Sequence, residues 1–402
     1  MTVQTILHPV SGFYLGAAAA KIKKNGKTDL VVIELVEGTI TAATFTLNAF
    51  CAAPVSVAKK HLALTQPRAL LINSGNANAG TGKQGMSDAI QSCTWLANEL
   101  GCTPEQVLPF STGVIGQNLP MEKMHLGIAQ ACSNMNVMAW KEASDGIMTT
   151  DLVPKQVSKQ FEMDGRTVTI TGISKGSGMI HPNMATMLSF VATDAKINQA
   201  CLQQCLADAT NVSFNRITVD GDTSTNDACT LSATQQVDMP EIHSIESKAY
   251  QQFAKVVTEV MITLAQMIVR DGEGATKFVS VVVEGGLDTQ ECLNVAHAIA
   301  LSPLVKTALF ASDPNWGRIL AAVGRADVTN LNIDAIQLYL GDVCIVENGG
   351  RAATYTEEAG QAVMNESDIT IRVKLHRGNV SETVWTTDFS YDYVKINAEY
   401  RS

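Results

Sequence analysis

The segment Gly172-Ile173-Ser174-Lys175-Gly176-Ser177-Gly178-Met179-Ile180-His181-Pro182-Asn183-Met184-Ala185-Thr186-Met187-Leu188 lies near the middle of the chain. The β-type run Thr167 to Ser174 leads into it, and the apolar run Met187 to Val191 follows it. Between the two runs stand glycines and a Pro-Asn pair, which accept backbone conformations that other residues avoid. The sequence therefore predicts two strands joined by a tight, irregular connection.

The same segment ends in a step that can carry chemistry. In Ala185-Thr186 a hydroxyl directly follows a small residue, and a threonine hydroxyl can attack the carbonyl of its own preceding peptide bond. Cleavage there would give Thr186 a free amine beside its hydroxyl, which is one form of activated nucleophile. A glycine-rich connection is most often only a loop, and threonine is a common strand former. The segment by itself leaves both interpretations open.

Composition limits the classes of protein to consider. The chain has 402 residues, 46% hydrophobic and 17% charged, with a net charge of −10. These values predict a large globular core and no basic surface for nucleic acid. The sequence contains no run of about 18 uninterrupted apolar residues, so no membrane span is predicted. The N-terminus lacks the pattern of a signal peptide. We therefore expect a cytoplasmic protein.

Cysteine and histidine usage does not predict a metal site. The nine cysteines are scattered without a CxxC pair, and the seven histidines are equally dispersed. Neither a zinc site nor a disulfide framework is predicted from such spacing. We therefore expect no bound metal and no resident cofactor.

Strand-like and helix-like segments mix in both halves of the chain. The strand-like runs are Leu30–Leu35, Thr39–Phe45, Ala69–Ile72, Thr167–Ile173, Leu188–Ala192, Phe278–Glu284, Ile336–Leu340 and Ile369–Leu375. The helix-like stretches are Gly85–Leu100, Glu122–Ser133, Asn198–Thr210, Glu241–Arg270 and Gln290–Ser302. This mixture predicts a layered α/β body. The glycine-rich signatures of nucleotide-binding folds do not occur.

Two stretches in the first half are too polar and too small to belong to the core. The first, residues 73–82, carries Asn and Gly and is either a set of turns or a source of amide donors for a carboxylate-bearing ligand. The second, residues 111–116, contains Thr112-Gly113. A hydroxyl beside a glycine N–H can hold the oxyanion of an acyl-transfer reaction, although Thr-Gly is more often a plain turn.

Two further polar stretches lie in the second half. Residues 219–227 carry three carboxylates, but the glycine comes too early and the closing glutamate is missing for an EF-hand. We expect a structured loop there, one that could line the site. Residues 269–277 contain Glu273 between two glycines at the expected end of a long helix. A capping glycine explains Gly272, whereas Glu273 is a candidate for binding a substrate ammonium group.

Taken together, these stretches resemble the ornithine acetyltransferase family, the glutamate N-acetyltransferases of arginine biosynthesis. The resemblance spans the whole chain in order. It rests on Asn73-Ser74-Gly75-Asn76-Ala77-Asn78-Ala79, Ser111-Thr112-Gly113-Val114-Ile115-Gly116, Ile147-Met148-Thr149-Thr150-Asp151, Lys175-Gly176-Ser177-Gly178-Met179-Ile180, Pro182-Asn183-Met184-Ala185-Thr186-Met187-Leu188, Asp271-Gly272-Glu273-Gly274-Ala275-Thr276-Lys277, Asp313-Pro314-Asn315-Trp316-Gly317-Arg318 and Ile396-Asn397-Ala398-Glu399-Tyr400-Arg401-Ser402.

The resemblance implies a fold and a processing event. It implies self-cleavage between Ala185 and Thr186 into an α chain, residues 1–185, and a β chain, residues 186–402. The chains would stay together as a layered, N-terminal-nucleophile-like sandwich of mixed sheets and helices. They would pair into an α2β2 heterotetramer.

The resemblance also implies roles for single residues. Thr186 would be the nucleophile with its freed α-amine as base, and Thr112 with Gly113 would form the oxyanion hole. The implied substrate contacts are Thr149, Lys175, Thr186, Glu273, Asn397 and Ser402. The motif contains both Thr149 and Thr150, so which of them makes the contact stays open. The C-terminus is expected to be ordered in the site.

Some positions depart from the family pattern. Gly80 stands where a cysteine is common, His181 where a small residue is common, and Leu47-Asn48-Ala49 replaces a stretch that usually carries Thr and Arg. None of them coincides with the nucleophile or oxyanion residues. His181 could be read as a base, but the freed amine of Thr186 already supplies one.

The expected reaction is a ping-pong acetyl transfer from N-acetylornithine to glutamate through an acetyl-Thr186 ester. Three alternatives stay open. The enzyme could also use acetyl-CoA as donor; it could be an aminopeptidase or amidohydrolase that passes the acyl group to water; or it could be a binding protein that never cleaves.

Overall fold

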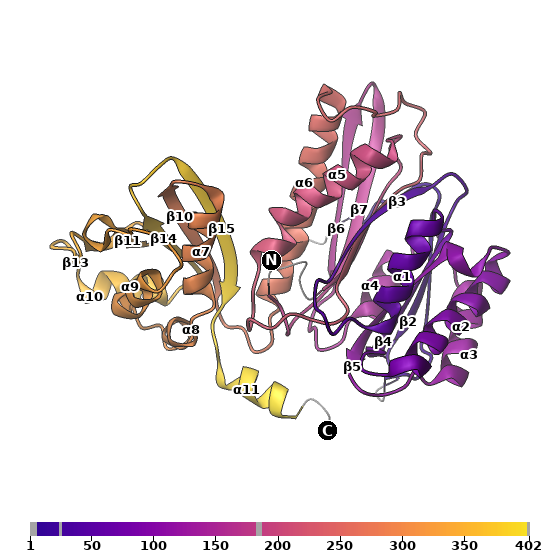
Figure 1. Ribbon diagram of the computed structural model, residues 1–402, viewed down its shortest axis with the longest axis horizontal. Helices are drawn as coiled ribbons and strands as arrows, with labels where there is room; N and C mark the ends of the chain where they lie inside the picture. The colour runs from indigo at the N-terminus through magenta and orange to yellow at the C-terminus, as the bar shows by residue number, and fades with distance from the viewer. Residues whose placement is uncertain (1–5, 24–25, 182–186, 400–402) are drawn as a thin grey trace. The chain divides into compact units, whose positions relative to one another are not determined.

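The computed structural model describes residues 6–23, 26–181 and 187–399. The chain divides into two compact units (Figure 1). Unit 1 comprises residues 1–215 and 222–268, and unit 2 comprises residues 216–221 and 269–402. The predicted cleavage position falls inside unit 1. The predicted boundary between the α and β chains therefore differs from the boundary between the two compact units.

Unit 1 contains two sheets. The first sheet has the order β1-β2-β4-β5, and the second has the order β3-β9-β8-β7-β6. The strands of the first sheet are β1 (Phe13–Ala18), β2 (Leu30–Leu35), β4 (Ala69–Asn76) and β5 (Val107–Val114). Those of the second are β3 (Ile40–Phe45), β9 (Ala228–Ala233), β8 (Leu188–Thr193), β7 (Arg166–Lys175) and β6 (Lys155–Met163).

The two sheets of unit 1 share one core. Phe110 of β5 meets Phe190 of β8 edge-to-face, with ring centroids 5.1 Å apart, and both side chains are buried. Helix α4 (Trp140–Ile147) contacts both β1 and β7. Its Trp140 stacks on Phe13 at 5.1 Å. Buried aromatic pairs of this kind add specific geometry to apolar burial, so the two sheets are held face to face.

Helices cover the outer faces of unit 1. On the first sheet, α2 (Gly82–Leu100) and α3 (Met121–Ser133) enclose a separate apolar cluster, and α1 (Ala53–Leu64) packs on β5 and α2. On the second sheet, α5 (Gln199–Asn211) contacts β3 and β9. Helix α6 (Lys248–Arg270) approaches β7, where Leu264 packs over Gly172. The result is a helix–sheet–sheet–helix layering.

Among the described residues, helix α6 is the only unbroken helix that is long and apolar enough to cross a membrane. One face of it is buried: Phe253, Val257 and Leu264 are among the side chains with no exposed surface. The opposite face carries Glu259, which pairs with Lys159 of β6 at 2.5 Å. This one-sided burial is the pattern of an amphipathic core helix.

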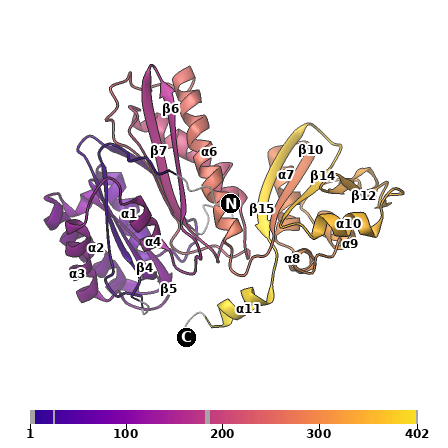
Figure 2. The same cartoon turned by 180° about the vertical axis from the view of Figure 1, so that it is seen from behind.

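Unit 2 is built on one six-stranded sheet of order β13-β12-β11-β14-β10-β15 (Figure 2). Its strands are β10 (Phe278–Gly286), β11 (Gln337–Leu340), β12 (Val343–Glu347), β13 (Gly350–Arg351), β14 (Asp368–Lys374) and β15 (Val380–Thr387). Its helices are α7 (Thr289–Ala300), α8 (Pro303–Phe310), α9 (Trp316–Gly324), α10 (Glu357–Met364) and α11 (Tyr391–Ala398). Helix α7 packs on β10 and β15 over a single apolar core.

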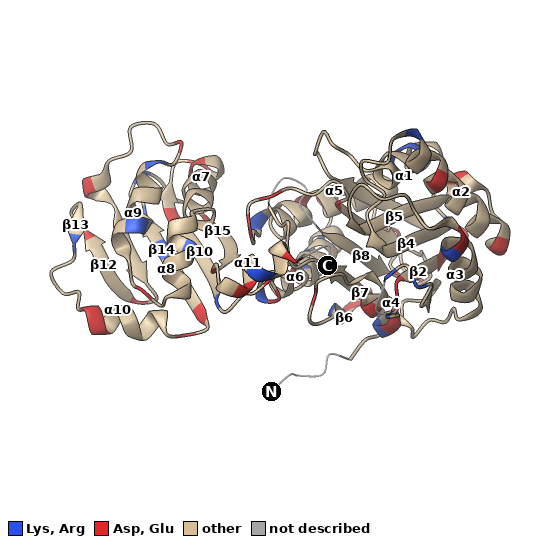
Figure 3. Ribbon diagram, turned by 90° about the horizontal axis from the view of Figure 1, so that it is seen from below, with Lys and Arg blue, Asp and Glu red and all other residues tan. Residues whose placement is uncertain are grey.

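Burial along the strands follows their place in the layers. In β10 the side chains of Val279, Val281 and Val283 are buried and alternate with less buried ones, as expected where one face is covered. Every residue of β8, Leu188–Thr193, is buried, because that strand lies inside the second sheet between two layers. Charged residues of both signs are interspersed along the helices and loops of both units (Figure 3).

The predicted layered α/β class is confirmed, and most predicted elements occur near their expected bounds. One helix was predicted too long: Glu241–Arg270 begins only at Lys248. The preceding residues do not continue the helix because Ile242 forms an isolated bridge with Ile197: its N–H donates to the Lys196 carbonyl, and its carbonyl accepts from the Asn198 N–H. Ser111–Val114, for which a turn was the alternative, is the end of strand β5.

Candidate active site

The carboxyl ends of β4 and β5 approach each other unusually closely. These strands run parallel, with Ser74 opposite Thr112 and Gly75 opposite Gly113, and the register shifts at Gly75 and Asn76. Gly75 has φ +98° and Gly113 has φ +133°. A Cβ at Gly113 would lie only 2.3 Å from the Gly75 carbonyl carbon and 2.5 Å from Asn76 N. This strand end therefore requires glycine at position 113.

The asparagines of the 73–82 stretch build this strand end. Asn73 Nδ2 donates to the Asn76 carbonyl at 2.8 Å, and Ser111 Oγ donates to Asn73 Oδ1 at 2.6 Å. Asn76 Nδ2 donates to two carbonyls of residues 117 and 118, and Asn78 Nδ2 donates to the Gly85 carbonyl. These amide donors hold the loop in place, which favours the structural interpretation of the stretch over a ligand-binding one.

Thr112 and Gly113 stand at the tip of β5. Thr112 is buried, with 6% of its surface exposed, and its hydroxyl makes no hydrogen bond to another described residue. Because its strand neighbour Ser111 is anchored to Asn73, the position of the Thr112 hydroxyl is set by the first sheet. A hydroxyl and a backbone N–H held this way can together polarise a carbonyl oxygen.

Lys175 lies at the end of β7, paired with Leu188 at the start of β8. Its side chain is buried, with 8% exposed. A buried ammonium requires a nearby negative charge, and Asp151 and Asp227 both lie within electrostatic range. Lys175 is therefore a cation held inside unit 1, and its strand partner Leu188 is two residues after Thr186 in sequence.

Asp151 organises the surroundings of Lys175. Its Oδ1 accepts from Lys155 Nζ at 2.5 Å and from Gly176 N at 2.8 Å, and its Oδ2 accepts from Thr149 N at 2.9 Å. Burial would raise the pKa of Asp151, but the charges of Lys155 and Lys175 outweigh it and hold that pKa below its usual range. Asp151 thus joins the loop of Thr149 to the end of β7.

Sequence reasoning gave Asp151 no role. The available signal was the spacing of Asp151 and Lys155, which are four residues apart. Opposite charges at this spacing usually pair along a helix, but this segment leads into a strand. Thr149 and Thr150 are both half-buried in the loop after α4, and the backbone of Thr149, not its side chain, makes the bond to Asp151.

A second lysine lies beside the strand end. A Cβ at Gly75 would come within 2.9 Å of Lys23 Cγ, and Lys23 Nζ donates to the Thr28 carbonyl at 2.9 Å. Burial lowers the pKa of Lys23 to about 8, opposed in part by the charges of Asp29 and Asp151. The sequence contained no signal for this placement, because Lys23 sits in an ordinary Lys-Lys-Asn-Gly loop.

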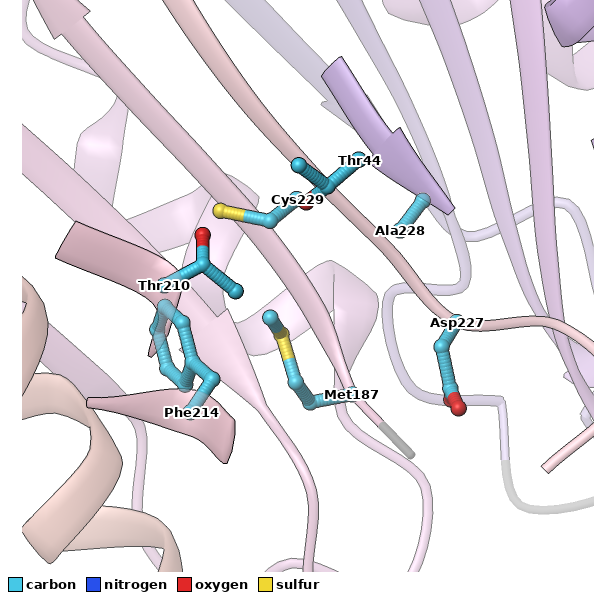
Figure 4. A pocket seen from close by; sticks show the side chains of 7 residues that line it. All are labelled: Thr44, Met187, Thr210, Phe214, Asp227, Ala228 and Cys229. Atoms are coloured by element: carbon cyan, nitrogen blue, oxygen red, sulfur yellow. The ribbon is translucent and has the colours of Figure 1, made fainter. Parts of the chain in front are cut away.

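The predicted cleavage site, Ala185 and Thr186, lies outside the described residues. The residue that follows, Met187, is buried, and it lines a small pocket together with Thr210, Phe214 and Cys229 (Figure 4). His181, on the other side of the gap, is half-buried. Burial lowers the pKa of His181, with the charge of Asp222 acting against this shift.

In unit 2 the structure joins two predicted substrate residues that are 124 positions apart in sequence. Asn397 Nδ2, on α11, donates to Glu273 Oε2 at 2.8 Å and to the Tyr393 carbonyl at 3.0 Å. The Glu273 side chain is buried, with 7% exposed. A carboxylate fixed by an amide in this way is oriented for a cationic group. Ser402 lies outside the described residues.

The loop of Glu273 is held by α11 and by Asp388. Gly274 has φ +68°, and a Cβ there would lie 2.5 Å from Tyr393 N, so α11 packs directly on the loop. Asp388 accepts hydrogen bonds from Thr276 N at 2.8 Å and Lys277 N at 2.9 Å. Sequence reasoning missed Asp388, since it stands alone at the end of β15.

Lys306 of α8 is fully buried near Asp388. Its Nζ donates to Thr386 Oγ1 at 2.9 Å and to the Thr387 carbonyl. Burial lowers the pKa of Lys306 to about 7, although the charges of Asp388 and Asp220 favour the protonated form. Lys306 therefore braces the end of β15 from which α11 departs.

The structure thus assigns the predicted residues to two groups. Thr112, Gly113, Thr149 and Lys175 belong to unit 1, and Glu273 and Asn397 belong to unit 2. Among the residues described, no cluster of three or more His, Cys, Asp and Glu side chains is arranged to hold a metal ion.

Two facing sheets between helix layers, with a glycine-dependent strand end on the first sheet and a buried lysine on the second, define a layered α/β protein. A family model described as the ArgJ family matches residues 14–402. The chain belongs to the ArgJ family, which confirms the family predicted from the sequence.

Individual relatives agree with this membership. The chain is 57% identical over 396 residues to the arginine biosynthesis bifunctional protein ArgJ of Pseudomonas syringae pv. tomato, and 56% identical to that of Pseudomonas fluorescens. In both comparisons 98% of each chain is covered. A crystal structure of arginine biosynthesis bifunctional protein ArgJ from Bacillus halodurans matches with a TM-score of 0.51 and 42% identity. It covers 53% of this chain and 99% of that chain.

Proposed function

We propose that this chain is an N-acetyltransferase of arginine biosynthesis. In the proposed reaction it moves the acetyl group of N-acetylornithine to glutamate and so produces ornithine and N-acetylglutamate. The relatives' name assigns those proteins to arginine biosynthesis. The acyl carrier is Thr186, freed as an N-terminus by cleavage of the Ala185–Thr186 bond.

The observation that carries the proposal is the strand register of β7 and β8. Lys175 pairs with Leu188, and Thr186 is two residues before Leu188 in sequence. The buried ammonium therefore belongs to a residue whose strand partner is two positions after the proposed nucleophile in sequence. Both substrates carry a carboxylate beside the acylated or acceptor amine, and a buried lysine is suited to bind it.

The chemistry proceeds in two balanced transfers. Thr186 Oγ attacks the acetyl carbonyl while the Thr186 α-amine, with an ordinary pKa of about 8, accepts the hydroxyl proton. Thr112 Oγ1 and the Gly113 N–H stabilise the oxyanion. The bond from the acetyl carbon to the ornithine nitrogen then breaks, and the amine returns the proton to that leaving nitrogen. The amine of glutamate next attacks the acetyl ester, and the bond from the acetyl carbon to Thr186 Oγ breaks. The Thr186 α-amine carries the proton from the attacking nitrogen to Thr186 Oγ, which gives free Thr186 and N-acetylglutamate.

In this proposal Glu273 and Asn397 recognise the substrate side chain. Glu273, fixed by Asn397, would bind the side-chain ammonium of ornithine. Thr149 or Thr150 and Ser402 would supply further polar contacts. No metal or resident cofactor takes part in the proposed steps, because an amide becomes an ester and then an amide again.

The fold supports two chains that stay together after cleavage. Strands β8 and β9 belong to residues 186–402, whereas their neighbours β7 and β3 belong to residues 1–185. Separation would break ladders on both sides of the β9-β8 pair. The solved Bacillus halodurans chain matches 53% of this chain over 99% of its own length, and residues 186–402 are also a little more than half of the chain. We further propose an α2β2 assembly in the cytoplasm.

Mass spectrometry of the purified wild type beside Thr186→Ala tests the proposal. The wild type should give one fragment ending at Ala185 and one starting at Thr186, and the variant should remain intact. Ser189→Ala, on β8 but beyond the scissile bond, is the control and should cleave. An intact wild type that still transfers acetyl groups would contradict the mechanism.

A second donor is favoured by the word bifunctional in the relatives' name. We propose that acetyl-CoA also acylates Thr186. Incubation with acetyl-CoA and glutamate should then release free thiol and N-acetylglutamate, and Thr186→Ala should abolish both products. Release of acetate without glutamate would instead support the hydrolase alternative.

A further inference from the structure

The segment Ser224-Thr225-Asn226-Asp227 is polar in sequence but buried in unit 1. It directly precedes β9. Four consecutive buried polar residues are expensive unless each finds a hydrogen-bond partner, so their partners show what the segment does. The proposed mechanism uses none of these four residues.

Asn226 is bonded to the strand ends of the first sheet. Its Nδ2 donates to the Ala77 carbonyl at 2.7 Å and to the Ser111 carbonyl at 2.9 Å. Ala77 directly follows β4, and Ser111 directly precedes Thr112 on β5. Both amide hydrogens of this side chain therefore donate to the ends of the two strands that form the proposed oxyanion site.

Asp227 is bonded to the first residue after the proposed nucleophile. The Met187 N–H and both the backbone and the hydroxyl of Ser224 act as hydrogen-bond partners of its carboxyl, and Ala228 N donates to the Met187 carbonyl at 3.1 Å. The side chain is 3% exposed, and its Oδ2 has no hydrogen-bond partner among the described residues. Figure 4 shows Asp227 and Met187, which directly precede the neighbouring strands β9 and β8.

The electrostatic surroundings of Asp227 agree with a positioning role. Burial raises the pKa of Asp227 well above its usual range, and the charge of Lys175 acts against that shift. The group therefore lies in the same buried polar region as the proposed substrate lysine, while the hydrogen bond to Met187 holds it to the backbone.

We propose that Asn226 and Asp227 are a pair of positioning residues for acyl transfer. Asn226 sets the oxyanion strand of the first sheet, and Asp227 sets the start of β8, to which the nucleophile is attached. The inference rests on the proposed function, because it needs Thr186 as nucleophile and Thr112 with Gly113 as oxyanion donors.

The physical reason is that the reacting groups come from different sheets. A displacement of about 1 Å between a nucleophile and its oxyanion donors can cost about 100-fold in rate. Two adjacent residues on one short segment keep the spacing between the two sheets constant. After cleavage they would belong to residues 186–402 and Ser111 to residues 1–185, so Asn226 would also clamp the two chains at the site.

Isosteric variants separate this role from simple packing. Asn226→Asp keeps size and shape, but a carboxylate cannot donate to the carbonyls of Ala77 and Ser111. We expect both the cleavage rate and kcat to fall by about 100-fold, with KM near the wild-type value. Asp227→Leu, which removes the acceptor for Met187 N–H, should give the same loss, and Asp227→Asn, which keeps an acceptor oxygen, should stay close to wild type.

Val191→Ala is the control: it should lower stability without changing the position of the start of β8 or of the oxyanion strand. Val191 is buried in the middle of β8, so its truncation lowers Tm but leaves Met187 bonded. Cleavage followed by mass spectrometry and acetyl transfer by steady-state kinetics are measured for all four variants. Asn226→Asp and Asp227→Leu forms that cleave and turn over like Val191→Ala would overturn the inference alone. A wild type that does not cleave would overturn the proposed function and this inference with it.

Discussion

Gly113→Ala is the sharpest test of the strand end where β4 and β5 meet. An alanine there must adopt φ +133°, and its Cβ would lie 2.3 Å from the Gly75 carbonyl carbon and 2.5 Å from Asn76 N. These are backbone atoms, so no side chain can swing away to relieve the contact. The strand ends must separate or the residue must change its backbone conformation.

The expected cost follows from two terms. A non-glycine residue in a sparsely populated backbone region costs about 1–3 kcal/mol, and forcing an extra methyl into packed structure costs about 1–3 kcal/mol. Together they predict a loss of about 2–6 kcal/mol in the free energy of unfolding. Because the proposed oxyanion N–H moves with the strand, kcat should also fall by about 100-fold.

Gly116→Ala is the matched control. Gly116 also has a positive φ, +82°, but nothing lies within 4 Å of a Cβ built on it. It should therefore lose only the backbone term, about 1–2 kcal/mol. Urea unfolding followed by circular dichroism compares the two variants, and acetyl-transfer kinetics follows on each. Equal losses of stability in both variants would refute the close-approach reasoning.

Three further predictions follow from buried charges. Lys155→Met leaves Asp151 buried without its ion-pair partner and should lower the free energy of unfolding by about 3–5 kcal/mol. The control Lys141→Met breaks an exposed pair at the same four-residue spacing and should lower it by about 0.5 kcal/mol. Urea midpoints that shift equally in both variants would contradict this. Glu273→Gln should raise KM for N-acetylornithine and leave the cleavage of the precursor unchanged, so an unaltered KM argues against ammonium binding. Burial lowers the pKa of Lys306 to about 7 in the folded protein, so the unfolded chain binds more protons between pH 7 and about 10.5 and the contribution of Lys306 to stability rises with pH. The free energy of unfolding of the wild type minus that of Lys306→Met should therefore increase from pH 6.5 to pH 9.5. A difference that does not change with pH would contradict the lowered pKa.

The sequence by itself determined the family, the layered α/β class and the identity of the candidate residues. Long local motifs made this possible: the Gly172–Leu188 segment predicted two strands and a connection, and the structure has β7 and β8 there. Apolar runs such as Leu30–Leu35 predicted buried strands because burial on both faces leaves no alternation to misread.

Only the tertiary structure decided which residues support those candidates. Asn226 and Asp388 look like ordinary loop polar residues in sequence, because their hydrogen-bond partners are more than 100 positions away along the chain. The hydrogen bond of Asn397 to Glu273 spans 124 positions, and the close approach of Gly113 to Gly75 depends on the register of two parallel strands. Local sequence predicts local conformation, whereas the burial and pairing of polar groups depend on which distant segments the fold brings together.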